Sequence, residues 1–104
     1  MSAAEDLTVT DAPAERRYEA RSGGELAGVA VYLRSSELIA FLHTEVEDAY
    51  EGRGVGSALA RTALDDARAQ GLRVLAICPF IDGWITKHPA YEDLRYESTS
   101  RVTD

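Results

Sequence analysis

The chain has 104 residues, of which 45% are hydrophobic and 28% charged, which indicates one folded domain rather than a disordered segment. Its formal net charge of -7 disfavours nucleic acids as partners, because binding to phosphate backbones depends on clustered Lys and Arg. No apolar run approaches the roughly 18 residues of a membrane span, and residues 1–6 lack the basic start and apolar run of a signal peptide. Cys78 is the only cysteine, so we expect no intramolecular disulfide and a reducing, cytoplasmic compartment.

The first third of the chain predicts antiparallel strands. Residues 1–13 are expected to form a polar lead-in with a short strand at 7–9. Charged and apolar residues alternate over 15–21, as in a partly exposed edge strand, and the two glycines in 22–25 permit the positive φ of a hairpin turn. Residues 26–33 are apolar on both faces, as expected of a central strand that is covered on both sides.

The next predicted strand, 38–46, carries the first polar candidates. Strict alternation would place its side chains on two faces: Leu38, Ala40, Leu42, Thr44 and Val46 on one, and Ile39, Phe41, His43 and Glu45 on the other. The polar residues therefore gather at the C-terminal end of this strand.

The rest of the chain predicts two helices around one more strand. A helix is expected from about Gly54 to Gln70, because apolar residues recur there at helical spacing and Gly71 is a natural stop. A short apolar strand follows over 73–77, and a second helix begins at Pro79 and runs to about His88. The order of three antiparallel strands, helix, strand and helix predicts an α/β (α+β) domain with a mixed, mostly antiparallel sheet and two helices.

The segment Gly52-Arg53-Gly54-Val55-Gly56 joins the strand to the first helix. A helix N-terminus leaves backbone N–H groups unpaired, and glycines let that backbone approach a pyrophosphate closely. The pattern therefore predicts a phosphate cradle, with a tight turn that holds no ligand as the alternative. A nucleoside-triphosphate loop is excluded because it ends in Gly-Lys-Ser/Thr, and a dinucleotide fold is excluded because antiparallel hairpins come first.

Several ordered motifs together resemble the GNAT N-acetyltransferases. They are His43-Thr44-Glu45-Val46, Tyr50-Glu51-Gly52-Arg53-Gly54-Val55-Gly56-Ser57, Cys78-Pro79-Phe80 and Lys87-His88-Pro89-Ala90-Tyr91. The resemblance is to the small single-domain subgroup, and it covers about residues 15–95 of a single domain over 1–104. It implies a compact GNAT-like fold that binds acetyl-CoA as co-substrate.

The resemblance also implies roles for individual residues. The backbone amides of the turn would bind the pyrophosphate, and these belong to Glu51, Gly52, Arg53, Gly54, Val55, Gly56 and Ser57. The strand edge from Thr44 to Val46 would pair with the pantetheine arm. Apart from the resemblance, Lys87 and His88 lie near the end of the second predicted helix, where they would meet the nucleotide part of the cofactor or else be charges that a helix C-terminus favours. Glu51 departs from the family, which usually has Gln or Arg there, and Arg53 would supply the missing positive charge.

The catalytic candidates are Cys78, His43 and Glu45. Cys78 precedes a helix that starts with Pro, a position that favours the reactive thiolate, so it would lie beside the thioester or accept the acetyl group. The alternative is a buried cysteine that acts as a small hydrophobe. His43 and Glu45 would deprotonate an amine, or else be a core histidine and an exposed strand-end carboxylate. Two well-separated histidines and one cysteine show no metal-ligand spacing.

The function expected from these features is transfer of acetyl from acetyl-CoA to an unidentified amine, on a small molecule or a protein. The alternative is a CoA-binding or protein-interaction module with little or no catalytic activity. The alternative follows from a short acceptor region, because the chain lacks the helical segment that shapes the acceptor pocket of larger family members.

Overall fold

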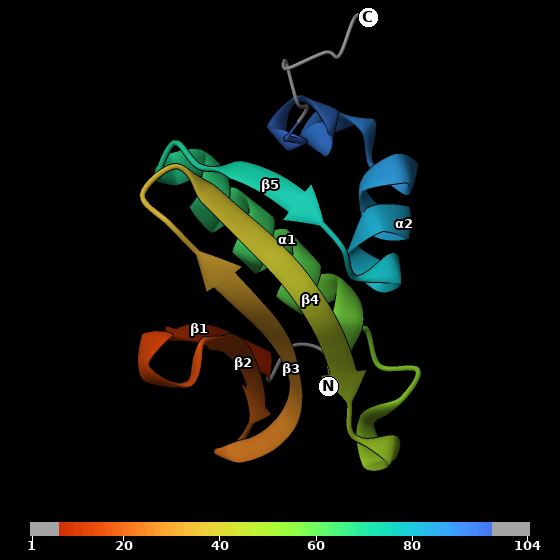
Figure 1. The fold of residues 1–104 in the computed structure, drawn as a ribbon. Coiled ribbons are helices and arrows are strands. Elements are labelled where there is room, and N and C mark those ends of the chain that lie inside the picture. The colour runs from red at the N-terminus through yellow and green to blue at the C-terminus, as the bar shows by residue number, and fades with distance from the viewer. Residues whose placement is uncertain (1–6, 97–104) are drawn as a thin grey trace, which may run out of the picture.

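The computed structural model describes residues 7–96, which form one mixed sheet of five strands with two α-helices (Figure 1). The strands lie side by side in chain order: β1 (Leu7–Ala12), β2 (Arg17–Ser22), β3 (Glu25–Arg34), β4 (Leu38–Val46) and β5 (Arg73–Ala76). The first four pair antiparallel, and β5 is parallel to β4. The helices are α1 (Val55–Ala69) and α2 (Pro79–Lys87), with short 3₁₀ helices η2 (Pro13–Glu15), η3 (Asp48–Tyr50) and η4 (Pro89–Leu94). The predicted mixed, mostly antiparallel sheet with two helices is confirmed.

The N-terminal region differs from the expectation. The short strand predicted at 7–9 is present and extends to Ala12 as β1, so β1 is the edge strand and β2 lies inside the sheet. The polar residues of β2 looked like those of an edge strand, but Arg17 and Arg21 donate hydrogen bonds to Glu19 between them. Residues 1–6, where a signal segment was judged absent, and the polar tail 97–104 lie outside the described residues.

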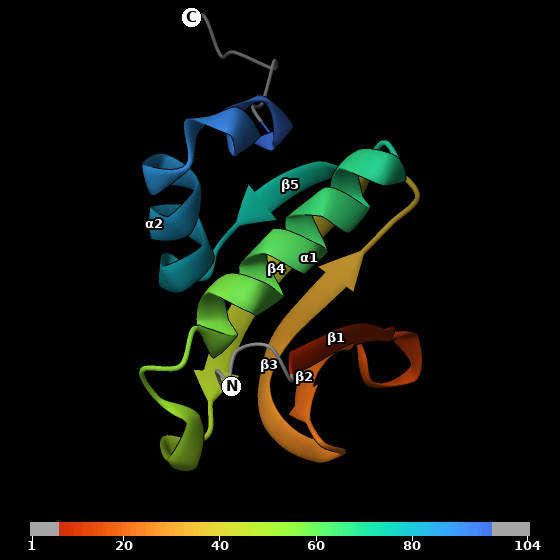
Figure 2. The ribbon, with the colours of Figure 1, turned by 180° about the vertical axis from the view of Figure 1, so that it is seen from behind.

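Helix α1 runs across one face of the sheet and closes the core against it (Figure 2). Six residues of α1 are buried at helical spacing: Val55, Leu59, Ala60, Ala63, Leu64 and Ala67. They meet aromatic side chains of the sheet, where Tyr18, Tyr32 and Phe41 pack in a row. The Tyr18 hydroxyl donates to the Asp66 carboxylate of α1 at 2.8 Å, so the buried phenol also ties β2 to the helix.

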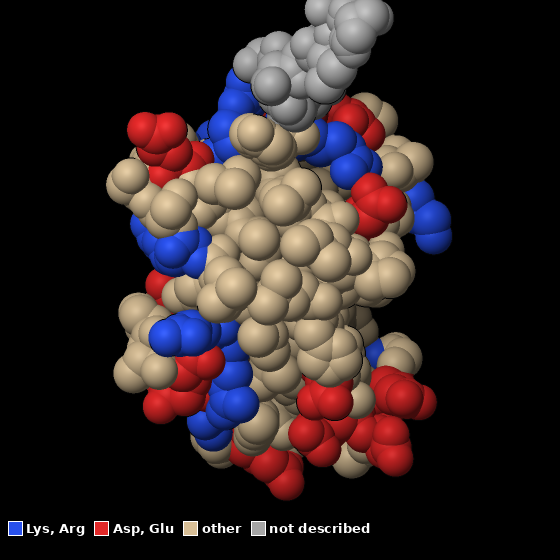
Figure 3. All heavy atoms as spheres, in the orientation of Figure 1, with Lys and Arg blue, Asp and Glu red and all other residues tan. Residues whose placement is uncertain are grey.

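The opposite face of the sheet, called the open face here, is crossed by no described helix (Figure 1). The prediction that β3 is covered on both sides holds for residues 27–30, which are all buried, and fails near the end of the strand, where Leu33 is 48% exposed. Figure 3 shows the open face as a broad uncharged surface over β4 and β5, with acidic side chains gathered near the C-terminal end of β4.

A β-bulge in β4 changes the face of the sheet on which each side chain of its second half lies. Val31 pairs with His43 and the next residue, Tyr32, pairs with Phe41, so Leu42 is an extra residue in the ladder. Because directly paired residues share a face, Thr44 and Val46 lie on the α1 side together with Phe41. The prediction that Phe41, His43 and Glu45 share a face was therefore wrong, and His43 and Glu45 lie on the open face.

Strands β4 and β5 part just beyond this bulge. They pair only from Leu38 to Phe41, and the carbonyl of Phe41 then accepts hydrogen bonds from the amides of both Ile77 and Cys78, at 3.1 and 2.8 Å. Beyond Phe41, β4 continues to Val46 while the chain after β5 turns into α2. The second half of β4 therefore has a backbone edge that β5 does not cover.

Glu19 is a nearly buried carboxylate between two arginines on β2. It is 9% exposed, and it accepts hydrogen bonds from Arg21 and Arg17, each at 2.9 Å. The Arg21 and Arg17 guanidinium groups hold the pKa of Glu19 below its ordinary value of 4.5. The contribution of this carboxylate to stability is therefore complete above pH 4.5 and is lost as the pH falls through the lower folded-state pKa.

We expect Glu19→Gln to lower the free energy of unfolding by about 1 kcal/mol at pH 7, because it removes the charge from two charge-assisted hydrogen bonds. The difference from the wild type should shrink as the pH falls below 4.5. Urea unfolding of both proteins over this pH range measures it. A difference that stays constant down to the acid limit would contradict the assigned role.

Candidate active site

The turn before α1 has the geometry of an open backbone cradle. Gly52 and Gly54 both have φ of +80°, which side chains rarely adopt, and an added Cβ at either would meet nothing within 4 Å. Gly54 is the N-cap, and no side chain caps this helix. The amide of Ala58 is bonded to the carbonyl of Gly54, and helix geometry leaves the preceding amides of α1 without intrahelical partners.

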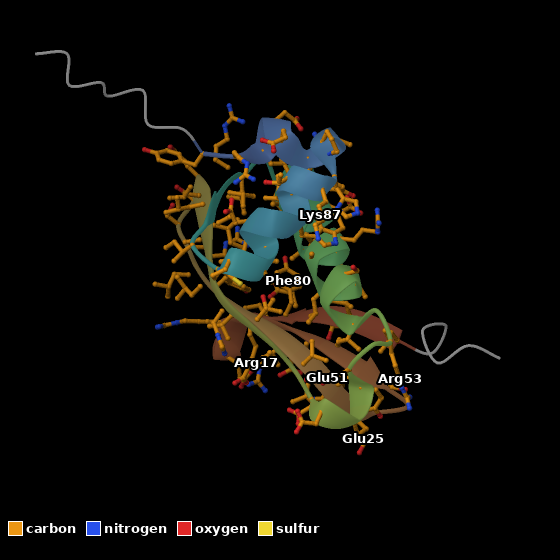
Figure 4. All side chains as sticks on the ribbon, turned by 90° about the vertical axis from the view of Figure 1, so that its right-hand side faces the viewer. Arg17, Glu25, Glu51, Arg53, Phe80 and Lys87 are labelled. Atoms are coloured by element: carbon orange, nitrogen blue, oxygen red, sulfur yellow. The ribbon has the colours of Figure 1, made fainter. Side chains whose placement is uncertain are left out.

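The start of α1 lies in contact with the start of α2. A Cβ at Gly56 would stand 2.8 Å from Cζ of Phe80, so a larger residue there would push the ring aside. The phenyl ring is 43% exposed and forms part of the surface above the turn. Figure 4 shows Phe80 and Lys87 on α2 and, below them, Glu51 and Arg53 on the turn.

A hollow of about 260 Å³, called the turn groove here, lies along this cradle. Nine residues line it: Val46, Tyr50, Glu51, Gly52, Gly54, Val55, Gly56, Ser57 and Phe80. Eight of these come from the end of β4 and the predicted glycine-rich segment. Arg53 is outside the lining, and its guanidinium lies 5.3 Å from the ring centroid of Tyr50.

A second hollow of about 350 Å³, called the α2 hollow here, adjoins the first. Its lining is Ser57, Pro79, Phe80, Gly83, Trp84, Lys87 and His88. Ser57 and Phe80 line both hollows, so the two are neighbours on either side of the Phe80 ring. The predicted nucleotide contact Lys87 thus lies at the far end of a surface that begins at the glycine turn.

A third hollow, about 380 Å³ in volume, adjoins the turn groove on the other side and is strongly acidic. Four carboxylates line it, those of Glu25, Glu45, Glu47 and Asp48, and it shares Val46 and Tyr50 with the turn groove. The Tyr50 hydroxyl donates to Glu25 at 2.6 Å, and that hydrogen bond raises the pKa of Tyr50. This acidic hollow accounts for the charged group at the end of β4 in Figure 3.

The three catalytic candidates lie in two separate places, Cys78 beside Thr44 and His43 beside Glu45. Cys78 is 3% exposed, and its Sγ lies 3.3 Å from Thr44 Oγ1 on the α1 side of β4. His43 Nε2 lies 3.3 Å from a Glu45 carboxylate oxygen on the open face, and these side chains are 57% and 66% exposed. The bulge at Leu42 separates the pairs, because without it Thr44 would share the face of Leu42 and Ala40 rather than that of Phe41.

Sequence reasoning missed several contributors to these surfaces: Glu25, Glu47 and Asp48 of the acidic hollow, and Pro79, Phe80, Gly83 and Trp84 of α2. Phe80, Gly83, Trp84 and Lys87 follow the spacing i, i+3, i+4, i+7 that puts side chains on one face of a helix. That spacing was visible in the sequence, but the contact between Phe80 and Gly56 depends on how the two helices meet. Trp84 is only 5% exposed, so most of its indole packs inside the protein.

Among residues 7–96, no helix has the length and apolarity that a membrane crossing requires. Within the same residues, no three His, Cys, Asp or Glu side chains are grouped so that they could hold a metal ion.

Gly83 occupies the interior of α2 without a structural need for glycine. Its φ is not positive, and an added Cβ would meet nothing within 4 Å. We expect Gly83→Ala to raise the free energy of unfolding by about 0.5–1 kcal/mol, because alanine has the higher helix propensity. Urea unfolding measures this change, and a destabilised variant would show that the space beside Gly83 is filled.

Solved structures share this arrangement of strands and helices. A GCN5-like protein from Staphylococcus aureus superimposes with a TM-score of 0.65 at 23% identity, over 94% of this chain and 96% of that one. Ard1 from Thermoplasma volcanium superimposes with a TM-score of 0.56 at 24% identity, over 76% of this chain and 55% of that one. A ribosomal-protein-alanine N-acetyltransferase from Brucella melitensis superimposes with a TM-score of 0.55 at 18% identity, over 85% of this chain and 65% of that one. At these low sequence identities the similarity shows a shared fold only.

Relatives in sequence match about half of the chain. The chain is 43% identical to Protein NATD1 of Bos taurus over 47 residues, which is 45% of this chain and 42% of that protein. It is 37% identical to Protein NATD1 of Gallus gallus over 54 residues, which is 52% and 49% of the two chains. The matched part spans just under half of these relatives. The family model described as GCN5-related N-acetyl-transferase matches residues 17–94, and the chain therefore belongs to the GCN5-related N-acetyltransferase family.

Proposed function

We propose that this chain binds acetyl-CoA in the turn groove and transfers its acetyl group to an amine. The observation that carries the proposal is the glycine turn with two positive φ values, which opens α1 next to the uncovered half of β4. Together these give backbone amides for a pyrophosphate and a strand edge for the amide-containing pantetheine arm.

The residues present fit this ligand. Gly52 and Gly54 line the turn groove without side chains, so a phosphate can approach the amides at the start of α1. The edge from Thr44 to Val46 has its backbone available for pairing with an extended chain. When bound, acetyl-CoA supplies a thioester carbonyl, which an amine attacks with loss of the thiol. Glu51 adds a negative charge to the groove lining, and this charge repels a phosphate. In this proposal, phosphate binding therefore depends on the backbone amides.

The acidic hollow supports an amine as the acceptor. Its four carboxylates favour a cationic group, and it meets the turn groove at Val46 and Tyr50. An amine that arrives as an ammonium must lose a proton before it can act as a nucleophile. Glu45 belongs to this hollow and is paired with His43, so we assign the proton-accepting role to these two side chains.

Direct transfer fits the structure better than a covalent relay through Cys78. The thiol is 3% exposed and lies against the Thr44 hydroxyl, whereas His43 and Glu45 are open to solvent. Mass spectrometry of the intact protein after exposure to acetyl-CoA tests the relay, which requires an acetyl adduct that Cys78→Ala abolishes.

The single free cysteine also fits a reducing compartment, and we propose the cytoplasm.

The proposal is tested by thermal unfolding with and without acetyl-CoA. A ligand that binds only the native state at 100 times its Kd stabilises it by about 2.7 kcal/mol, a shift of several degrees for a domain of this size. No shift at millimolar acetyl-CoA would overturn both the enzyme and a CoA-binding module. Measuring the release of free CoA in the presence of a panel of amines then distinguishes an enzyme from a CoA-binding module, because only the enzyme converts acetyl-CoA to CoA.

A further inference from the structure

A row of apolar side chains, called the apolar row here, crosses the open face of the sheet. Leu33 of β3 pairs with Ala40 of β4, and Ala40 pairs with Leu75 of β5, so the three side chains follow one another across three strands. Leu33 is 48% exposed, and Ile77, which directly follows β5, is 55% exposed. Contiguous exposed apolar surface is typical of contact with another protein. Figure 3 shows it as the uncharged centre of the open face.

The proton-accepting pair of the proposed function lies on the same face. Val31 is two residues from Leu33 and pairs with His43. Val29 is four residues from Leu33 and pairs with Glu45. At about 3.3 Å per residue, the level of Glu45 is therefore about 13 Å from the apolar row. One continuous surface leads from the apolar row to the acidic hollow.

The charges on this surface favour a cationic partner. Four carboxylates line the acidic hollow, in a chain whose net charge is -7. At the other side of the open face, the guanidinium groups of Arg17 and Arg21 are already paired with Glu19. The open face is therefore complementary to a partner with cationic groups over the hollow and an apolar group over the row.

A segment of protein chain fits this surface better than a free small amine does. A small amine can enter the acidic hollow, but it leaves the apolar row uncovered. An extended segment spans the same distance of about 13 Å in four residues, so it can cover both places at once. A lysine suits the hollow because its four-carbon stem carries the ammonium from the level of the backbone to the carboxylates.

A second copy of this chain is a poorer occupant of the open face. Both copies would carry a net charge of -7, and each would bring an acidic hollow to the interface.

We propose that the open face binds the acceptor as a basic, extended segment of another protein, with a lysine in the acidic hollow and an apolar side chain four residues away on the apolar row. This inference rests on the proposed function, which places the pantetheine arm along the edge of β4 that β5 leaves uncovered. The lysine ammonium gives one proton to Glu45 or His43. Its nitrogen then bonds the acetyl carbon, the carbon–sulfur bond breaks, and the second proton ends on the CoA thiol.

Acetyl transfer to matched peptides tests the proposal. One peptide is Leu-Arg-Gly-Arg-Lys and its control is Ser-Arg-Gly-Arg-Lys, both blocked at the two ends, and a second pair has the reversed order. The rates of formation of free CoA and of acetyl-lysine give kcat/KM. For the wild type, we expect a leucine peptide to exceed its serine control at least about tenfold, which is the effect of burying one leucine side chain.

Leu33→Ser provides a second arm, since it removes an apolar side chain from the row. Leu33 is exposed, so the variant should fold like the wild type, as circular dichroism checks. We expect the preference for the leucine peptide to fall below about threefold in this variant. Leu33→Met keeps an apolar side chain and should keep the preference.

The possible results separate this inference from the proposed function. Equal kcat/KM of the wild type for leucine and serine peptides, or transfer to small amines but to no peptide, would overturn this inference and leave the proposed function intact. Transfer to neither peptides nor small amines would overturn the proposed transfer, and this inference with it. A wild type that sediments as a dimer, and that Leu33→Ser converts to a monomer, would assign the open face to a second copy and also overturn the inference.

Discussion

Replacement of Gly54 by valine is expected to abolish acetyl-CoA binding, with a loss of at least about 100-fold in affinity. Gly54 has φ of +80° at the N-cap of α1, and a β-branched residue there forces the turn out of its left-handed conformation. The amides that follow would then no longer face the turn groove together. Calorimetric titration with acetyl-CoA measures the loss.

Gly71→Val is the matched control for Gly54→Val. Gly71 has φ of +72° just beyond the opposite end of α1, and an added Cβ would again meet nothing within 4 Å. Both variants should lower the free energy of unfolding by about 1–3 kcal/mol through backbone strain. Only Gly54→Val should lose binding, and an equal loss in both variants would mean that the turn has no specific part in it.

Phe41→Ala is expected to lower the free energy of unfolding by about 3–5 kcal/mol, a large share of the stability of a domain of this size. Phe41 is 0% exposed and packs edge-on against Tyr32, with ring centroids 6.4 Å apart. The cavity would lie where β4 and β5 separate, beneath the bulge at Leu42. Urea unfolding at pH 7 gives the value.

Leu33→Ala is the control for Phe41→Ala, since Leu33 pairs with Ala40 of β4 but lies on the open face and is 48% exposed. Truncation of the Leu33 side chain should lower the free energy of unfolding by less than about 1 kcal/mol. Similar costs for the two variants would mean that the open face is covered in solution, in conflict with the one-sided core described above.

The local parts of this fold were predictable from the sequence. Helical spacing and Gly71 placed α1 to within one residue at each end, and Pro79 marked the start of α2. The glycine pair after Ser22 located the hairpin between β2 and β3. These features depend on the neighbouring residues alone, so the sequence contains the information needed to place them.

Features that depend on distant partners were not predictable. The bulge at Leu42 arises from the register between β3 and β4, and nothing in the alternation of β4 marks it. It brings Thr44 to Cys78 and leaves His43 and Glu45 on the other face, so the three predicted catalytic candidates lie in two separate places. The open face of the sheet was hidden for a similar reason, since apolar strands look alike whether or not a second layer covers them.

The site shows the same division between local and distant information. The glycine turn could be identified from its own residues, because positive φ and free amides are local properties. The acidic hollow could not, since Glu25 comes from β3 and Asp48 from η3. The contact between Phe80 and Gly56 also joins elements that are distant along the chain, and it is what makes the turn groove and the α2 hollow neighbours.

Nuclear magnetic resonance titration of the ¹⁵N-labelled chain with acetyl-CoA tests the central claim most directly. We predict saturable shifts of the backbone amides in residues 52–57, along the β4 edge at 44–46, and along α2 from Phe80 to His88. The amides of β1, at the far edge of the sheet, should change little. Absence of saturable shifts, or shifts confined to β1 and β2, would contradict the claim that the glycine turn and the adjoining surface of α2 bind acetyl-CoA.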